Sequence, residues 1–215
     1  MFWRGGLRAQ YALDRLLAEC RTRGIAGRCL DLGCGRGDYY RQLAASGQFE
    51  TVHGLDSNPA LARHIGRGFV RGRMEDFSPE EPYDVIWCSH VLEHTPNPGQ
   101  FLQRLHVLLR EDGLLCISVP PMKQAVTVGH VTLWTPGLLL LNLVKAGYDC
   151  SDIRMKRKGY NIAALLLRKP CPQVTTFDPD APASCRPYLP AGLKWHFRSK
   201  RKVWNYKGDF RTLNW

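Results

Sequence analysis

Hydrophobic residues recur along this chain in short blocks that alternate between two spacings. Near-continuous apolar blocks are typical of buried strands and occur at 28–32, 51–56, 83–89 and 114–119, with a weaker one at 69–77. Between these blocks the apolar residues take a helical spacing, which predicts helices at 7–20, 39–47, 101–110 and from Asn58. Strands that alternate with helices predict a mainly parallel, doubly wound sheet.

The segment after residue 134 continues this alternation and then changes it. Thr135 and Pro136 begin a predicted helix that ends at Gly147. Two strand candidates follow, with a tight turn at Lys158 and Gly159, which predicts an antiparallel hairpin at one edge of the sheet. Together with the five earlier strands, the hairpin makes a seven-stranded sheet in a protein of the α/β class.

Charge is distributed unevenly over the 215 residues, whose formal net charge is +11. Residues 29–168 are almost neutral, with fifteen basic and fourteen acidic residues, so both ends carry the excess. We therefore predict an N-terminal helical segment at 1–26, one folded domain at 27–168 and a Pro-rich, basic C-terminal extension at 169–215. The neutral middle weakens the interpretation as a generic nucleic-acid-binding domain, which would carry a basic face on its core.

The cysteines and the N-terminus bear on the compartment. None of the eight cysteines forms a C-x-x-C pair, which argues against a zinc ribbon or a thioredoxin-like motif. Charged residues interrupt the N-terminus where a signal peptide would have its apolar core. The longest strongly apolar stretch, 138–144, is far shorter than the roughly 20 residues of a membrane span. We expect a cytoplasmic chain with free thiols.

The most informative segment is DLGCGRGD at 31–38, which joins the first strand to a helix. Glycines at such a turn let a ligand approach the backbone at the carboxyl end of the strand. No Gly-Lys-Ser/Thr follows, so the segment is not a P-loop, and the third glycine of the dinucleotide fingerprint would fall on Asp38. Asp31 and Asp38 would repel a pyrophosphate. A ligand with a positive end and no phosphates, such as S-adenosylmethionine, fits better.

At these residues the chain resembles the class I S-adenosylmethionine-dependent methyltransferases, in particular their broad type 11/type 12 small-molecule group. Four segments carry the resemblance over roughly 27–168: the glycine turn, Asp56 at the end of the second strand, the acids after the third strand, and SHVLEHTPNP with LREDGLLCISVP. The resemblance implies a Rossmann-like fold, S-adenosylmethionine as the cofactor and methyl transfer as the reaction.

The resemblance also implies which residues bind the cofactor. They lie at and after the carboxyl ends of the strands: Asp31, Gly33, Cys34, Gly35, Gly37, Asp56, Ser57, Glu75, Asp76 and Ser89. Asp56 would accept the ribose hydroxyls, although it could instead only cap the following helix. Either Glu75 or Asp76 would meet the adenine amino group, although both could be surface acids.

The pattern H-x-x-E-H at 90–94 has several readings. It is not an inverted zinc-protease motif, because it lies between a strand end and Pro96. Ubiquinone-pathway O-methyltransferases and small-RNA 2′-O-methyltransferases hold a divalent metal with E-x-x-E-H at this place. In this chain His90 replaces the first acid, so we predict no metal site. Glu93 and His94 would instead hold the loop by hydrogen bonds.

Two histidines are the predicted catalytic residues. His90 lies close to the expected position of the transferred methyl group, and His130 lies in the substrate-facing loop after the fifth strand, with Trp134 as an apolar wall. A general base is needed if the acceptor is a hydroxyl, and histidine titrates near neutral pH. A structural role, with the ring held by hydrogen bonds, is the alternative for each.

Basic and aromatic residues alternate through the last segment, 192–215. It is either a solvated extension, part of an anionic acceptor site, a peripheral contact with the inner, anionic membrane surface, or an RNA contact. We predict methylation of an oxygen, with nitrogen as the second choice, on a metabolite, sugar or glycan intermediate. An RNA (tRNA or rRNA) methyltransferase and a non-catalytic cofactor-binding partner remain open.

Overall fold

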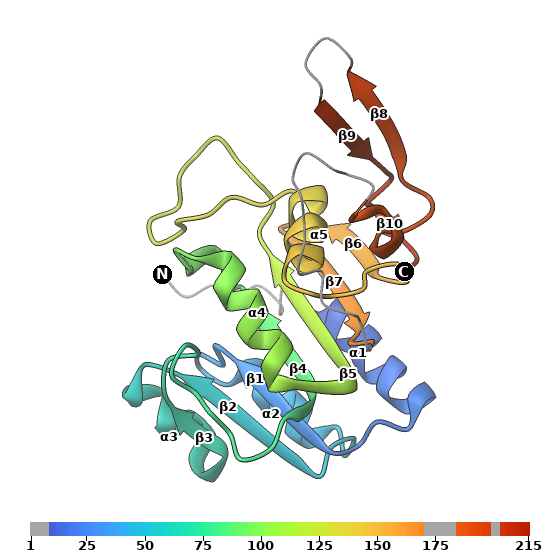
Figure 1. Ribbon diagram of the computed structural model, residues 1–215. Coiled ribbons are helices and arrows are strands. Elements are labelled where there is room, and N and C mark those ends of the chain that lie inside the picture. Colours follow the sequence, from blue (N-terminus) through green and yellow to red (C-terminus); the bar gives the residue numbers. More distant parts are fainter. Residues whose placement is uncertain (1–8, 170–183, 199–202) are drawn as a thin grey trace.

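The computed structural model describes residues 9–169, 184–198 and 203–215 and is built on a single large sheet (Figure 1). Its eight strands have the order β10-β6-β7-β5-β4-β1-β2-β3. Their bounds are β1 (Arg28–Leu32), β2 (Thr51–Asp56), β3 (Phe69–Arg71), β4 (Tyr83–Ser89), β5 (Leu109–Val119), β6 (Arg154–Lys158), β7 (Asn161–Leu167) and β10 (Thr212–Leu213). The first five strands are parallel, and β7 lies antiparallel between β5 and β6.

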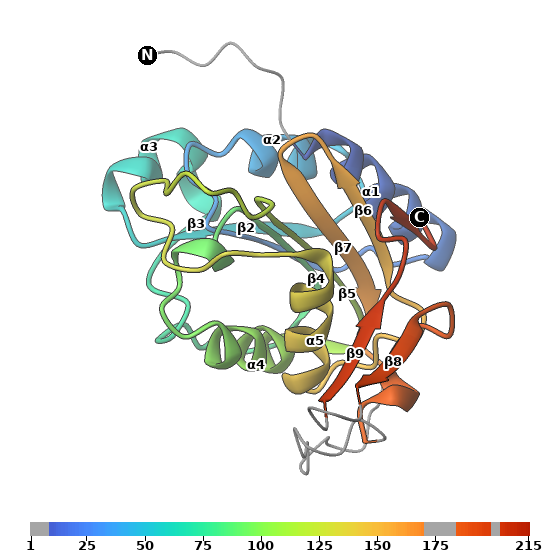
Figure 2. The ribbon, with the colours of Figure 1, turned by 90° about the horizontal axis from the view of Figure 1, so that it is seen from above.

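Helices cover both faces of this sheet (Figure 2). On one face lie α1 (Gln10–Arg23) and α2 (Asp38–Ala45), and on the other lie α4 (Pro98–Leu108) and α5 (Pro136–Lys145). Each presents its apolar stripe to the sheet, as α4 does with Phe101, Leu102, Leu105 and Leu108. The sheet is therefore buried on both sides, which explains why its central strands are near-continuous apolar runs.

Several helix starts follow the capping chemistry seen in the sequence. The Asn97 side chain accepts from the Gln100 backbone N–H at the start of α4, and Thr135 accepts from Leu138 at the start of α5, in both cases with a proline in the first turn. The helix predicted from Asn58 is only α3 (Ala62–Ile65), between the 3-10 turns η1 (Pro59–Leu61) and η2 (Gly66–Gly68). Gly66, with φ of 73°, ends it after one turn.

The C-terminal segment contributes more to the fold than predicted. The sheet contains one strand beyond the predicted seven, because β10 pairs antiparallel with β6 through Leu213 and Met155. Tyr206, Phe210 and Leu213 pack against the core on the α4–α5 side. A separate two-stranded hairpin is formed by β8 (Lys194–Arg198) and β9 (Val203–Lys207). Apolar packing thus anchors part of the basic extension to the domain.

Seven cysteines fall in the described part of the chain, and all of them are buried. Cys20, Cys29, Cys34, Cys88 and Cys116 are free thiols. Three of these, Cys29, Cys88 and Cys116, lie on β1, β4 and β5, where they pack as small apolar residues. The expectation of free thiols is confirmed for those five, while Cys171 lies outside the described residues. No helix among the described residues has both the length and the apolar character to cross a membrane.

Candidate functional site

A cavity of about 440 Å³ opens at the carboxyl ends of β1, β2 and β4. The chain runs from β1 outward to β2 and β3, then returns to β4 on the other side of β1, so the order reverses at this point. Such a reversal leaves a crevice beyond the strand ends, where open α/β sheets bind ligands. The walls are formed by Leu32, Gly33, Leu55, Asp56, Ser57, Gly72, Arg73, Met74, Glu75, His90, Val91, His94, Thr95 and Phe101.

The glycine turn borders this cavity through Gly33, and its backbone is left-handed. Gly35 and Gly37 are not among the lining residues of the described chain. Gly33, Gly35 and Gly37 have φ of 69°, 51° and 76°. At Gly33 a Cβ would lie 2.3 Å from Cγ2 of Val91, so only glycine allows the turn to pass beside that side chain. The thiol of Cys34 is turned toward Gly54 of β2, so this residue offers the ligand its backbone.

Asp31 lies at the base of the turn and is 2% exposed. Burial raises the pKa of its carboxyl to about 8, and the Asp56 and Asp38 carboxylates add to the rise, against a hydrogen bond from the Tyr40 backbone N–H. Its Oδ2 has no hydrogen-bond partner among the described residues. A buried acid with an unsatisfied oxygen beside a ligand cavity is suited to a cationic group.

Asp56 ends β2 and connects the glycine turn to the next segment. Its Oδ2 accepts from the Gly35 backbone N–H at 3.0 Å, and its Oδ1 accepts from the Asn58 N–H at 2.9 Å. The cap of the following helix is Asn58, whose side chain accepts from the Ala60 N–H, so Asp56 does not itself cap that helix. The Asp56 side chain lines the cavity beside Ser57. Each carboxylate oxygen can accept a second hydrogen bond, so these contacts leave room for a ligand hydroxyl.

The wall after β3 is formed by Gly72, Arg73, Met74 and Glu75. Of the two predicted acids, Glu75 lines the cavity and makes an ion pair with Arg73 at 3.5 Å. Asp76 is exposed and is not among the lining residues of the described chain. Met74 was not predicted as a site residue; it is a buried apolar residue of this wall.

Ser89 is the last residue of β4 and contacts β5 through its side chain. Its hydroxyl lies 2.8 Å from the hydroxyl of Ser118 on β5, the residue directly opposite it in the parallel ladder. The Ser118 carbonyl in turn accepts from the backbone N–H of His90. These contacts fix the carboxyl end of β4.

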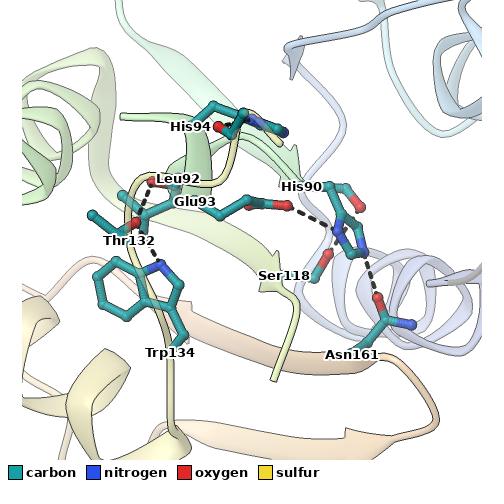
Figure 3. Close-up of polar contacts among 10 residues, drawn as sticks. His90, Leu92, Glu93, His94, Ser118, Thr132, Trp134 and Asn161 are labelled. Atoms are coloured by element: carbon teal, nitrogen blue, oxygen red, sulfur yellow. Dashed lines mark hydrogen bonds and ion pairs between the residues drawn. The ribbon is translucent and has the colours of Figure 1, made fainter. Parts of the chain in front are cut away.

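His90 is the central polar residue of the site (Figure 3). Its Nδ1 lies 3.0 Å from Oε1 of Glu93, and its Nε2 lies 2.6 Å from Oδ1 of Asn161 on β7. The backbone of His90 is left-handed, with φ of 58°, a conformation that few non-glycine residues adopt and that often marks functional sites. Glu93 is fully buried, so it holds the ring in one orientation from below.

His94, in the turn after β4, lies next to His130, in the loop between β5 and α5. The His94 ring contacts the His130 ring, with centroids 5.0 Å apart, and its Nδ1 lies 2.8 Å from the Gly129 carbonyl oxygen. Glu93, His94 and His130 each offer one possible metal-ligand atom within 4.8 Å of the others. The proximity of these three residues was not predicted, because no local sequence pattern shows that the loop after β5 brings His130 back to Glu93.

This donor set does not suit a hard divalent cation such as Mg²⁺. Mg²⁺ prefers oxygen ligands, whereas two of the three donors are imidazoles and Glu93 already bonds His90 through one oxygen. His90, which replaces the first acid, directs its ring nitrogens to Glu93 and Asn161. A softer ion such as Zn²⁺ is the one that two imidazoles and a carboxylate would suit.

The loop after β5 is fixed to the site by its backbone. The N–H groups of Val131 and Thr132 both donate to the Glu93 carbonyl. The Trp134 indole donates to the Thr132 hydroxyl and is 2% exposed within the core (Figure 3). Trp134 therefore supports the loop from inside, and the expected apolar substrate wall at this residue is wrong.

Comparison with protein families decides the identity of this arrangement. Residues 6–142 match the family described as a methyltransferase domain. The chain belongs to this methyltransferase family. The resemblance to class I S-adenosylmethionine-dependent methyltransferases, drawn from the glycine turn and the strand-end acids, is confirmed.

Curated methyltransferases are similar over the same region. A ubiquinone biosynthesis O-methyltransferase of Glaesserella parasuis is 34% identical over 112 residues, which cover 46% of this chain and 48% of that protein. A trans-aconitate 2-methyltransferase of Rhizobium rhizogenes is 30% identical over 131 residues, 56% of this chain and 51% of that protein. The chain thus spans about half the length of the curated relatives it matches.

Solved structures confirm the fold of this methyltransferase domain. The 1,6-didemethyltoxoflavin-N1-methyltransferase of Burkholderia thailandensis, solved with its substrate and S-adenosylhomocysteine, superposes with a TM-score of 0.59. The alignment covers 74% of this chain and 78% of that one at 22% identity. The Rossmann-like, mainly parallel sheet with an antiparallel edge is therefore shown.

Proposed function

We propose that the protein transfers a methyl group from S-adenosylmethionine to a hydroxyl of a small molecule. The observation that carries this proposal is one cavity whose walls include Gly33 of the left-handed glycine turn, the strand-end acid Asp56 and His90. The glycine turn and Asp56 offer binding groups for a cationic nucleoside, and His90 offers a proton acceptor. Together they join cofactor binding and acid–base chemistry in one place.

The residues present fit this cofactor. The unsatisfied oxygen of Asp31 and the turn at Gly33 and Gly35, which has no Cβ to block a ligand, would receive the methionine end, whose ammonium a carboxylate stabilises. Asp56 and Ser57 would bind the ribose, and the wall from Gly72 to Glu75, with Asp76 at its outer end, would bind the adenine. When bound, the cofactor supplies a methyl group on a sulfonium, which is an electrophilic carbon.

His90 would act as the general base, and Glu93 would orient it. The contact between Nε2 and the Asn161 oxygen needs a proton on Nε2, because an amide oxygen only accepts. The base form arises when that contact breaks: in the neutral ring, the Nδ1–H donates to the Glu93 carboxylate, which leaves the lone pair on Nε2. The acceptor hydroxyl would take the place of the Asn161 oxygen beside Nε2 and lose its proton to that nitrogen as the methyl group is transferred. Asn161 would then position the acceptor. His130 lies next to His94 and remains the second candidate for a base.

The acceptor is proposed to be small and acidic. The relatives named above methylate small molecules, as their names state. Next to His90 the ring of Tyr160 lies parallel at 6.1 Å, and the Lys123 Nζ lies 4.1 Å from the centroid of that ring. An aromatic face and an ammonium near the base favour a flat or unsaturated acceptor with an anionic group.

We propose that the reaction takes place in the cytoplasm. Cys20, Cys29, Cys34, Cys88 and Cys116 are buried free thiols, which a reducing compartment explains.

Transfer of a labelled methyl group tests the function. The protein and S-[methyl-³H]adenosylmethionine are incubated with a fractionated cell extract, and label is followed into small molecules, RNA and glycans. We expect label in an anionic small-molecule fraction that His90→Ala abolishes. Label confined to RNA or to glycans, or no transfer to any fraction, would contradict the proposal.

A further inference from the structure

The loop between β5 and α5, whose course Figure 1 shows, carries exposed apolar side chains. Every residue of 122–129 is exposed, and Val126 and Val128 are 81% and 98% exposed. Five of the seven most exposed large hydrophobic residues in the described chain lie here, namely Met122, Val126, Val128, Val131 and Leu133. A cluster of aliphatic side chains held in water marks an interaction surface.

The backbone of this loop is held in place, so the exposure is built into the fold. Met122 donates to the Trp134 carbonyl, and Pro121 and Trp134 form a bridge at the base of the loop. Further along, the Val131 N–H donates to the Glu93 carbonyl, and the Gly129 carbonyl contacts His94. The apolar side chains therefore project outward from an anchored frame.

Basic residues flank the aliphatic cluster without acidic neighbours. Lys123 is exposed on the loop, and Arg157 and Lys158 are exposed on the neighbouring β6–β7 turn. The contact of Lys123 with the Tyr160 ring joins the loop to that turn. Neither 120–135 nor 154–161 contains an Asp or a Glu. We call these residues, 122–133 with the turn at 157–160, the loop surface.

We propose that the loop surface docks the protein on an anionic lipid bilayer. Aliphatic side chains that project from a convex loop enter the interface, and the flanking ammonium and guanidinium groups are attracted to anionic headgroups. A protein partner is favoured less, because stable protein interfaces are anchored by aromatic side chains and Arg in pockets, and the described part of this cluster is aliphatic with Lys beside it.

Docking would also place the cavity at the bilayer. The loop touches the cavity wall through Gly129 and His94, so the exposed valines belong to a loop that borders the site. Figure 2, seen from above, shows the loop crossing the carboxyl ends of β4 and β5. An acceptor with an apolar part could then reach His90 directly from the lipid phase. This last consequence rests on the proposed function, whereas bilayer docking does not.

Vesicle co-sedimentation of the full chain tests the proposal. The double variant Val126→Ser, Val128→Ser is compared with Val107→Ser, which changes a valine that is 61% exposed on α4, outside the loop surface. We expect wild type and Val107→Ser to bind phosphatidylcholine–phosphatidylserine vesicles equally. The double variant should bind at least tenfold more weakly, about 1.4 kcal/mol, with unchanged thermal unfolding and unchanged affinity for S-adenosylhomocysteine.

Charge-reversal variants and added salt test the contribution of the basic residues to vesicle binding. Lys123→Glu with Lys158→Glu should weaken binding to the anionic vesicles, and added salt should weaken wild-type binding in the same way. Absence of wild-type binding to these vesicles would overturn the proposal. Equal binding of wild type and the valine double variant would also overturn it, because attachment would then come from another basic segment.

Discussion

The Nε2 atom of His90 lies 2.6 Å from Oδ1 of Asn161, although 71 residues separate the two along the chain. The contact joins the carboxyl end of β4 to the first residue of β7. The antiparallel edge hairpin thus contributes a side chain that contacts His90 of the cavity wall, in addition to extending the sheet. With Glu93 on the other ring nitrogen, His90 is held at both ends.

Replacement of His90 by Ala should separate chemistry from binding. Loss of a general base lowers kcat by about 100-fold or more, while the affinity for S-adenosylhomocysteine should change by less than about threefold, or 0.7 kcal/mol. His130→Ala is the matched control, since it changes the neighbouring imidazole and is expected to keep most of the turnover. Full turnover in His90→Ala would show that His90 is not the general base. Loss of turnover in His130→Ala alone would assign the general base to His130.

Gly33→Ala should be far more harmful than a similar change at another left-handed glycine. The new Cβ would lie 2.3 Å from Val91, on a backbone with φ of 69°. We expect a loss of roughly 2–4 kcal/mol in the free energy of unfolding, together with loss of cofactor binding. Gly47→Ala, with φ of 64° and no neighbouring atom within 4 Å, carries only the backbone cost of about 1–2 kcal/mol. Equal unfolding transitions for the two variants would show that the contact with Val91 does not constrain the turn.

Asp31 should make the ligand-free protein less stable as the pH rises. Its pKa is about 8 in the folded state and near 3.8 when solvated. The folded state therefore holds a proton that the unfolded state has lost, and the stability that this proton provides disappears between these two values. Asp31→Asn removes the effect, so its stability relative to wild type should increase by up to about 1.4 kcal/mol per pH unit within that window.

Chemical denaturation at pH 5.5, 7 and 8.5 measures this linkage. The gap between Asp31→Asn and wild type should widen toward the highest pH in the absence of ligand. S-adenosylhomocysteine, which carries an ammonium, should stabilise wild type more than Asp31→Asn at every pH. A constant gap across the series would mean that the carboxyl is ionised and satisfied in the ligand-free protein.

Magnesium should have no effect on this methyltransferase. The donor set of two imidazoles and a carboxylate already bonded to His90 is unsuited to a hard cation. We expect turnover to be the same in the presence of EDTA and of added MgCl₂. Activity that is lost in EDTA and restored by Mg²⁺ would contradict this prediction, because the protein would then use Mg²⁺ although His90 stands in place of the first acid.

The sequence predicted the central strands, the glycine turn and the position of Asp56, because each depends on residues that are close together along the chain. The central strands were found because both of their faces are buried, and the cofactor turn was found because only glycine accepts its backbone conformation. Asp56 could be placed because it directly ends β2, beside the turn. The predicted binding residues around it stay predictions until a ligand is bound.

Contacts between distant segments were not predictable in the same way. Asn161 and His90 meet only because β7 inserts between β5 and β6, and nothing in NIAALLL indicates a polar partner. The strand β10 is two residues long, and its pairing is stabilised by Phe210 and Leu213 packing on the core. His130 reaches Glu93 and His94 through a loop whose course depends on the buried Trp134.

Calorimetric titration with S-adenosylhomocysteine tests the central claim most directly. We predict one site per chain in the wild type and at least tenfold weaker binding in Asp56→Ala, a loss of about 1.4 kcal/mol or more. Glu80→Ala, which removes an exposed acid outside the cavity wall, should bind like wild type. No binding by the folded wild type, or unchanged affinity in Asp56→Ala, would contradict the assignment of this cavity as the cofactor site.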